Sequence, residues 1–238
     1  MNLSAPDYIK IYKVQDSVLP LIAPLIGDFY LTGGTALARF YLNHRYSDDL
    51  DFFTHRNTEF QKKVREIFEL LKLHYTIEEN TTVLSTDFIR INISKETTLK
   101  MEFVNDIAYR WGNTILTQHI AVDNIANILA NKLTALVSRD EPKDVFDIVS
   151  IAEHYAFNWK EIFKHAFEKQ IMNETDVSDR LAAFPVEWLQ NKLWLKSPID
   201  ADDLKQKLEI IADDFLFARD NSFGKGKIPI TEAKPNVY

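Results

Sequence analysis

The sequence predicts an α+β protein, in which a first half of mixed strands and helices is followed by a helical second half. Two observations predict this class. Short runs rich in β-forming residues all lie before residue 105, around one strongly amphipathic helix. After residue 120 the apolar residues recur instead at helical spacing. We expect an α/β core over 1–120, a helical domain over 121–220 and a flexible tail over 221–238.

The first half contains five β-like runs, a segment up to about Pro24 that is helical with loops, and two further helical runs. The expected strands are 29–32, 50–53, 75–78, 87–93 and 99–104, and the expected helices are 35–43 and 58–73. The helix over 58–73 has the clearest pattern, because Thr58 and Gln61 have the spacing of a capping box. Its apolar stripe consists of Val64, Ile67, Phe68 and Leu71.

The second half is predicted to be helical over 122–138, 142–155, 158–171 and 202–219. Pro142 suits the first turn of its helix. Trp188 and Trp194 are expected to be core or helix-packing residues rather than a platform for stacked bases.

Composition excludes several classes of protein. With 238 residues, 46% of them hydrophobic and 26% charged, the chain matches an ordinary globular protein. The absence of cysteine excludes disulfides, thiolate zinc sites and cysteine nucleophiles. No signal peptide or membrane-spanning segment is predicted, so we expect a cytoplasmic protein without a membrane partner. The net charge of −7 argues against a DNA-coating protein but leaves room for a local RNA-binding surface.

Several common enzyme patterns are also absent. The sequence has no P-loop, no G-x-S-x-G and no H-E-x-x-H, which argues against P-loop ATPases, α/β-hydrolases and zinc proteases.

The stretch over 31–53, LTGGTALARFYLNHRYSDDLDFF, carries the most chemical information. A strand is predicted to end at Gly33 and Gly34, and glycines at a strand-to-helix turn let the backbone approach a phosphate closely. Asp49 and Asp51 then open a second strand. Because side chains alternate along a strand, both carboxylates lie on one face, about 7 Å apart. Such a pair suits Mg²⁺, which prefers a few carboxylates together with substrate phosphates.

Each part of this stretch also has a plain structural explanation. A glycine pair before a helix is often just a tight turn, and an isolated D-x-D is often a solvated strand end. Their combination in this order favours a catalytic site.

GGTAL followed by HRYSDDLDFF resembles the AbiEii/AbiGii-type nucleotidyltransferases. These are toxins of abortive-infection toxin–antitoxin systems in the DNA polymerase β-like superfamily. The resemblance implies a polymerase-β-like core with a mixed sheet. Fourteen residues separate Gly34 from Asp49, slightly more than the usual spacer. The family commonly has Ser at the position of Gly34, so any phosphate contact expected here is through the backbone.

A second stretch, IANILANKLTALVSRDEPKDVFDIVSI, is similar to downstream motifs of the family. By this resemblance Lys132 faces the triphosphate, while Lys143, Asp144 and Asp147 form the later motif. The last three lie on one helix surface by their spacing alone. The structural alternatives are a solvated face with a local salt bridge, and for Lys132 an exposed ammonium on an apolar stem.

The resemblance assigns three sets of residues. The catalytic set is Asp49, Asp51, Lys132, Asp144 and Asp147. The nucleotide-binding set is Gly33, Gly34, Thr35, Arg45, Ser47 and Lys143. The metal-binding set is Asp49, Asp51 and a third carboxylate, for which Glu102 is the first candidate and Asp106 the second. The structural alternative for Glu102 is an edge-strand acid that faces water. The structural alternative for His44 and Arg45 is a role as surface residues.

The implied activity is Mg²⁺-dependent transfer of a nucleoside monophosphate from an NTP to an acceptor hydroxyl. The expected acceptor is RNA, in particular the 3′ end of tRNA, and the expected protein partner is an antitoxin. Two alternatives stay open: an acceptor that is a protein or a small molecule, and a non-catalytic protein of the same fold that binds nucleotide.

Overall fold

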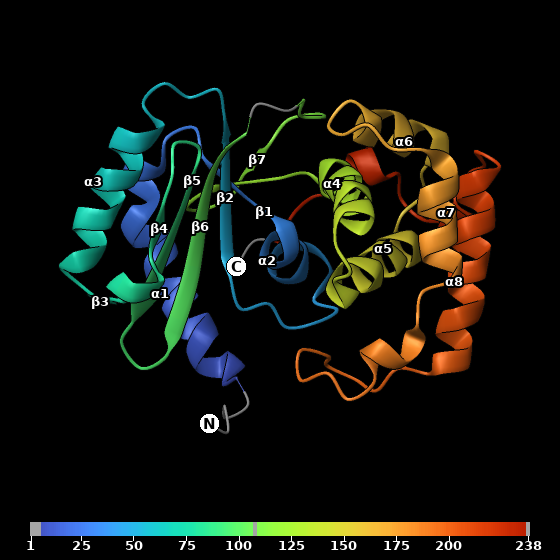
Figure 1. Cartoon of the computed structure of the whole chain (residues 1–238), viewed down its shortest axis with the longest axis horizontal. Coiled ribbons are helices and arrows are strands. Elements are labelled where there is room, and N and C mark those ends of the chain that lie inside the picture. Colours follow the sequence, from blue (N-terminus) through green and yellow to red (C-terminus); the bar gives the residue numbers. More distant parts are fainter. Residues whose placement is uncertain (1–5, 107–108, 237–238) are drawn as a thin grey trace. The chain divides into compact units, whose positions relative to one another are not determined.

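The computed structural model describes residues 6–106 and 109–236, and the chain divides into two compact units (Figure 1). The first unit draws on Met1–Ile107, Thr114–Asp123 and Pro235–Tyr238, and the second on Ala108–Asn113 and Asn124–Lys234. Residues 1–5 and 237–238, the outer ends of the expected core and tail, lie outside the described residues. The same is true of residues 107 and 108.

The first unit is built on a mixed sheet, which in the described part of the chain has eight strands in the order β3-β5-β6-β2-β1-β8-β7, with β4 paired to β5. Its strands are β1 (Tyr30–Thr32), β2 (Leu50–His55), β3 (Thr76–Ile77), β4 (Val83–Leu84), β5 (Phe88–Ser94), β6 (Thr98–Asp106), β7 (Ile115–Leu116) and β8 (Ala121–Val122). β2 runs parallel to β6 and antiparallel to β1, while β1 runs parallel to β8.

Two long helices, α1 (Tyr8–Ile26) and α3 (Phe60–Lys72), pack against each other and against the sheet (Figure 1). Four aromatic rings fill the space beneath them: Phe29, Phe52, Phe60 and Phe103 are each at most 1% exposed. Phe52 stacks on Phe103 with ring centroids 5.3 Å apart, and Phe29 meets Phe103 edge-on at 5.7 Å. The predicted stripe of α3 is confirmed for Val64, Ile67 and Leu71, which are buried.

The second unit is helical, which together with the mixed sheet confirms the predicted α+β class. Its α-helices are α4 (Ile125–Ser138), α5 (Pro142–His154), α6 (Trp159–Phe167), α7 (Glu174–Ala182) and α8 (Ala201–Leu216). Short 3₁₀ turns add η3 (Val186–Leu189), η4 (Ser222–Gly224) and η5 (Ile230–Glu232), and a further turn, η2 (Glu79–Thr81), belongs to the first unit. α4 packs against α5, α6 and α7, and α7 packs against α8.

Three local features differ from the sequence prediction. The helix expected over 35–43 begins earlier, as α2 (Gly33–Leu37), and continues as a π-helical segment, η1 (Ala38–Leu42). The capping box of α3 is wrong, because the side chain of Gln61 donates to the carbonyls of Ser85 and Thr86 instead. The helix expected from residue 122 begins at Ile125, because Val122 pairs in the sheet with Leu31.

The stretch expected to be a flexible tail is ordered by specific contacts over its described part. The Asn221 side chain donates to the carbonyls of Ala152 and Tyr155, and Ile230 is 4% exposed. Within the first unit, the amide of Asn236 donates to the Phe40 carbonyl. In the described residues, no helix has the length and apolar character needed to cross a membrane.

Candidate active site

Two neighbouring strands, β2 and β6, bring acidic side chains together on one face of the sheet. Asp51 of β2 lies opposite Thr32 of β1 on one side and Glu102 of β6 on the other. Leu50 and Phe52 are fully buried, whereas Asp49 and Asp51 are partly exposed, so the predicted alternation is confirmed. The face that carries the carboxylates is therefore opposite to the one that carries the aromatic core.

Lys100 provides a positive charge at this cluster that the sequence analysis did not identify. Its Nζ lies 2.8 Å from Asp49 Oδ2 and 3.5 Å from Glu102 Oε1. Burial acts to lower the pKa of Lys100, but the hydrogen bond to Asp49 and the charges of Asp49, Glu102 and Asp51 outweigh it and raise the pKa. The signal was present in the sequence, because Lys100 precedes Glu102 by two residues in a strand.

Glu102 is held by a second cation from the next strand. Arg90 of β5 lies opposite Glu102, and its Nε and Nη2 lie 2.8 and 2.7 Å from Glu102 Oε1. The alternative of a solvated edge acid is wrong, since β6 is flanked by β5 and β2. Asp106, the other candidate for a third carboxylate, lies opposite His55, four residues further along β6.

Neighbouring side chains leave no room for a Cβ at Gly33 or at Gly34. Gly33 has φ +69°, and a Cβ there would lie 2.8 Å from Asp51 Oδ2. A Cβ at Gly34 would collide with the Arg45 guanidinium and lie 3.1 Å from Ser47 Oγ. The space that a serine would occupy at position 34 is thus filled by the side chains of Arg45 and Ser47.

Arg45 is therefore not a surface residue. It is 2% exposed, and its Nη1 donates to the Tyr46 carbonyl over 2.8 Å. Thr35, also buried, lies 2.9 Å from Ser47 Oγ and donates a hydrogen bond to the Asp49 carbonyl. These contacts fix the backbone that delivers Asp49.

Helix α1 holds the same loop from its other side. Gln15 is fully buried, and its Nε2 donates to the Ser47 carbonyl over 3.2 Å while its Oε1 accepts from Arg39 over 3.0 Å. The Tyr12 hydroxyl accepts from the Ser47 amide. Tyr8 stacks on Tyr46 with centroids 4.4 Å apart, and burial raises the pKa of Tyr8 to about 12. Such long-range positioning residues have no local signal in the sequence.

Asp123 is a further buried acid near the cluster. Its Oδ2 accepts a hydrogen bond of 2.8 Å from Thr32, whose strand partner is Asp51. The sequence analysis missed it because Asp123 fell inside a predicted helix; in the structure it follows β8.

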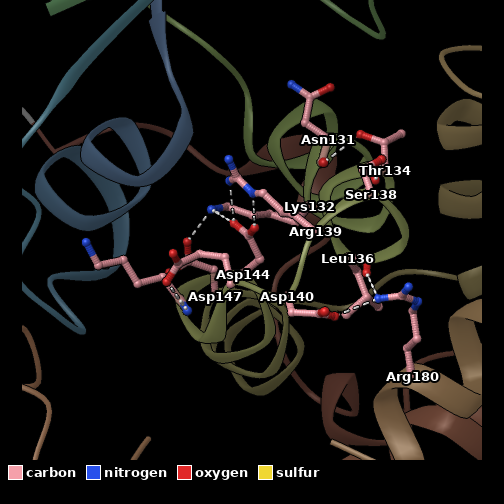
Figure 2. A network of polar contacts seen from close by, with 12 residues as sticks. Asn131, Lys132, Thr134, Leu136, Ser138, Arg139, Asp140, Asp144, Asp147 and Arg180 are labelled. Carbon is pink, nitrogen blue, oxygen red and sulfur yellow. Dashed lines mark hydrogen bonds and ion pairs between the residues drawn. The ribbon is translucent and has the colours of Figure 1, made fainter. Parts of the chain in front are cut away.

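The downstream motif forms a separate, buried network in the second unit (Figure 2). Lys132 of α4 points at two carboxylates of α5, with Nζ 2.7 Å from Asp144 Oδ1 and 2.6 Å from Asp147 Oδ2. The three residues are 6%, 1% and 0% exposed, respectively. The solvated-face and exposed-ammonium alternatives are therefore wrong for these side chains, while Lys143 is half-buried.

Arg139 closes this network at its solvent side. Its Nε lies 2.8 Å from Asp144 Oδ2 and its Nη2 lies 3.2 Å from Oδ1. Figure 2 shows Arg139 directed at the Asp144 carboxylate. Burial acts to raise the pKa of Asp144, but the charge of Lys132 and hydrogen bonds from Arg139 and Lys132 outweigh it, so the pKa is lowered.

No cluster of three or more His, Cys, Asp or Glu side chains suited to a metal ion occurs among residues 6–106 and 109–236. Glu102 is engaged by Arg90 and Lys100, and its role as a third metal ligand beside Asp49 and Asp51 stays a prediction. Asp49 and Asp51 still provide the carboxylate chemistry that Mg²⁺ prefers, and Gly33 leaves the Asp51 carboxylate free of a neighbouring Cβ. The acid pair therefore fits a divalent cation that is also bound by substrate.

The family described as "Nucleotidyl transferase AbiEii toxin, Type IV TA system" matches residues 22–225. The chain belongs to this family. It is accordingly a nucleotidyltransferase, its substrate is an NTP, and an antitoxin is its expected partner in a type IV toxin–antitoxin system. The family inferred from GGTAL and HRYSDDLDFF is confirmed.

Known proteins extend this similarity. The uncharacterized protein aq_aa25 of Aquifex aeolicus (strain VF5) is 29% identical over 160 residues, covering 65% of this chain and 73% of the relative. MenT4, a nucleotidyltransferase toxin from Mycobacterium tuberculosis H37Rv, has a TM-score of 0.62 at 15% identity, covering 93% of this chain and 87% of its own. JHP933 from Helicobacter pylori has a TM-score of 0.58 at 20% identity, covering 90% and 94%. At these identities the two solved structures establish the shared fold.

Gly33→Ala should damage the site beyond its effect on the backbone. A left-handed φ costs a non-glycine residue about 1–2 kcal/mol, and the new Cβ would also push the Asp51 carboxylate aside. We expect nucleotidyl transfer to fall about 100-fold, the order expected when a reacting group is misplaced. Gly226→Ala is the matched control, because Gly226 has φ +78° with nothing within 4 Å of its Cβ position. Equal activity of Gly33→Ala and Gly226→Ala would contradict the expected displacement of the Asp51 carboxylate by a Cβ at position 33.

Lys132→Met should destabilise the protein strongly, because it leaves the two buried carboxylates of Asp144 and Asp147 without their shared cation. We expect the free energy of unfolding, measured by urea denaturation, to fall by about 3–5 kcal/mol. Lys205→Met, an exposed lysine on α8, should change it by less than about 0.5 kcal/mol. A small change in the free energy of unfolding of Lys132→Met would contradict the role of Lys132 in compensating the buried charges of Asp144 and Asp147.

Proposed function

We propose that the protein transfers a nucleoside monophosphate from an NTP to a hydroxyl of RNA, at the 3′ end of tRNA, with Mg²⁺ held by Asp49 and Asp51. The observation that carries the proposal is the placement of Asp49 and Asp51 on one face at the start of β2, with Asp51 opposite Thr32 and next to Gly33. Two adjacent carboxylates beside a glycine turn can bind a metal ion that is also bound by the triphosphate of a substrate.

When bound, Mg²⁺ would neutralise phosphate charge and polarise the α-phosphate. The protein's own groups have three tasks around it. Asp49 and Asp51 supply the negative charge that keeps a metal–triphosphate complex in place. Gly33 and Gly34 present backbone without side chains, and Arg45, Ser47 and Thr35 hold that backbone in shape.

Lys100 is the cation of the first unit best placed to act on the triphosphate. Its ammonium lies between Asp49 and Glu102 and can turn from the carboxylates to a phosphate oxygen without leaving the site. Glu102, held by Arg90, serves to position Lys100. Lys132, Asp144, Asp147 and Lys143 remain assigned to the reaction by the family motif, with Lys132 oriented by the two acids.

The reaction is a single displacement at phosphorus. The acceptor hydroxyl oxygen attacks the α-phosphorus in line, the bond to the bridging oxygen of the β-phosphate breaks, and pyrophosphate leaves. The hydroxyl proton passes to solvent. Cationic side chains contribute by stabilising charge that develops on the phosphate oxygens.

The resemblance that identified the motifs implies an RNA acceptor, and the family to which the chain belongs is described as a toxin. The net charge of −7 requires that RNA be met on a restricted surface rather than over the whole protein.

A transfer assay tests the proposal directly. Each α-³²P-labelled NTP is incubated with Mg²⁺, total cell extract and either wild-type protein or the Asp49→Ala/Asp51→Ala variant. We expect label in tRNA with the wild type and a loss of at least about 1000-fold in the variant, because its phosphates are no longer anchored. Chelation with EDTA should abolish transfer as well.

Other outcomes would revise particular parts of the proposal. Label in protein or in a small molecule would keep the reaction and change the acceptor. Binding of Mg·NTP without transfer to any acceptor would overturn the catalytic proposal in favour of a nucleotide-binding protein.

Lys100→Met should lower kcat/KM for the NTP by about 10–100-fold, the value of one charge-assisted hydrogen bond. Lys100→Arg should recover part of the loss, since the charge is kept. Lys95→Met, an exposed lysine just before the same strand, should leave kcat/KM unchanged. An unaltered kcat/KM in Lys100→Met would restrict Lys100 to a structural ion pair.

A further inference from the structure

A cavity of about 420 Å³ opens in the second unit, lined by the end of α4, the start of α5, α7 and η3. Its volume falls in the range of small-molecule sites, about 300–1000 Å³. The side chains that give it chemical character are Arg139, Glu141, Asp179, Arg180, Phe184 and Trp188. None of them belongs to the catalytic assignments above.

The cavity has an aromatic wall. Trp188 is 44% exposed and so lies outside the core, whereas Trp194 is 8% exposed and packs against Phe146. Trp188 meets Phe184 edge to face, with centroids 6.1 Å apart and planes at 82°. A large indole kept half in solvent at a cavity is suited to stacking on a planar ligand.

Two guanidinium groups, those of Arg139 and Arg180, also line the cavity, and hydrogen bonds fix the orientation of both. Arg139 is bound to Asp144 through Nε and Nη2. Arg180 Nη1 donates to the Leu136 carbonyl over 3.1 Å and to Asp140 Oδ1 over 2.9 Å. A guanidinium held by its edge in this way offers its flat face, on which aromatic rings stack.

The charge of the lining selects against a phosphate. Arg139 and Arg180 are outweighed by three carboxylates that also line the cavity: Asp140, Glu141 and Asp179. Carboxylate oxygens accept hydrogen bonds from amino groups, as Glu and Asp do with the N4 amino group of cytosine. The preferred ligand is therefore an uncharged planar ring with amino donors at its edge.

We propose that this cavity binds one unpaired, amino-bearing nucleobase, cytosine or adenine, of the acceptor RNA. Single-stranded RNA is recognised by stacking of splayed bases on aromatic and arginine planes with hydrogen bonds to their edges, and the lining supplies all three elements. The inference rests on the proposed RNA acceptor and adds where one base is held.

The cavity is linked to the buried network by a shared residue. Arg139 lines the cavity and binds Asp144, which in turn binds Lys132. A base stacked on Arg139 would further fix the guanidinium and through it Asp144. Occupation of the cavity is thereby coupled to the order of the family motif.

Binding can be measured apart from catalysis. Full-length protein carrying Asp49→Ala/Asp51→Ala is titrated against fluorescein-labelled oligonucleotides ending in CCA or in UUU, and binding is followed by fluorescence anisotropy with Mg²⁺ present. We expect CCA to bind more tightly than UUU. Adding Trp188→Ala should weaken CCA binding by about 5–150-fold, the value of one stacked base, and Trp188→Phe should restore most of it.

Two further variants separate stacking from other effects. Leu193→Ala, which removes a 60% exposed apolar side chain nearby in sequence, should leave the affinity unchanged. Asp179→Asn should reduce the preference for CCA over UUU without affecting folding, because Asp179 is exposed.

The inference is overturned if the Trp188→Ala variant binds the CCA oligonucleotide as tightly as its parent. It is also overturned if a short arginine-rich peptide binds to the protein only when Trp188 is present and does not compete with the RNA. The latter result would assign the cavity to a protein partner. Either result leaves nucleotidyl transfer itself intact, whereas failure of the labelled-NTP assay with normal RNA binding would refute the proposed reaction alone.

Discussion

The pairing register between β2 and β6 is the constraint on which the first unit depends. In this register Phe52 lies opposite Phe103 and Asp51 lies opposite Glu102, so one face of the sheet is aromatic and the other acidic. Because side chains alternate along a strand, a slip of one residue would turn Asp51 into the core and Phe52 into the site. The packing that stabilises the fold therefore also sets the position of the carboxylates.

Neighbouring carboxylates repel one another, and in both units cationic side chains that lie beside the carboxylates offset this repulsion. In the first unit Lys100 and Arg90 offset Asp49 and Glu102 at half-exposed positions. In the second unit Lys132 offsets Asp144 and Asp147 at buried positions. The half-exposed pairs are weaker, so they can rearrange around a substrate, whereas breaking the buried one leaves uncompensated charge.

The glycine turn illustrates how one substitution can be absorbed by its surroundings. Where the family commonly has serine, Gly34 makes room for the Arg45 guanidinium, and the Ser47 hydroxyl lies close to the place of the missing side chain. Gln15 and Thr35 then secure the loop through its backbone carbonyls. The site is thus maintained by residues from three separate segments rather than by its motif alone.

The sequence by itself determined the α+β class, most of the helices, the alternation of Asp49, Leu50, Asp51 and Phe52, and the family. These follow from local periodicity and from residues close together in the chain, where spacing alone fixes which side chains share a face. The sequence prediction was wrong where contacts between distant segments determine the local structure. Val122 belongs to a strand because it pairs with Leu31. The Gln61 side chain bonds to the loop at Ser85 instead of capping its own helix. Only the tertiary structure decided that Glu102 faces Arg90 and Lys100, that Gln15 supports the loop before Asp49, and that Lys132 is buried between two acids. Each of these depends on strand register or helix packing between segments far apart in sequence, and such free energies of pairing and burial leave no periodic trace in the chain.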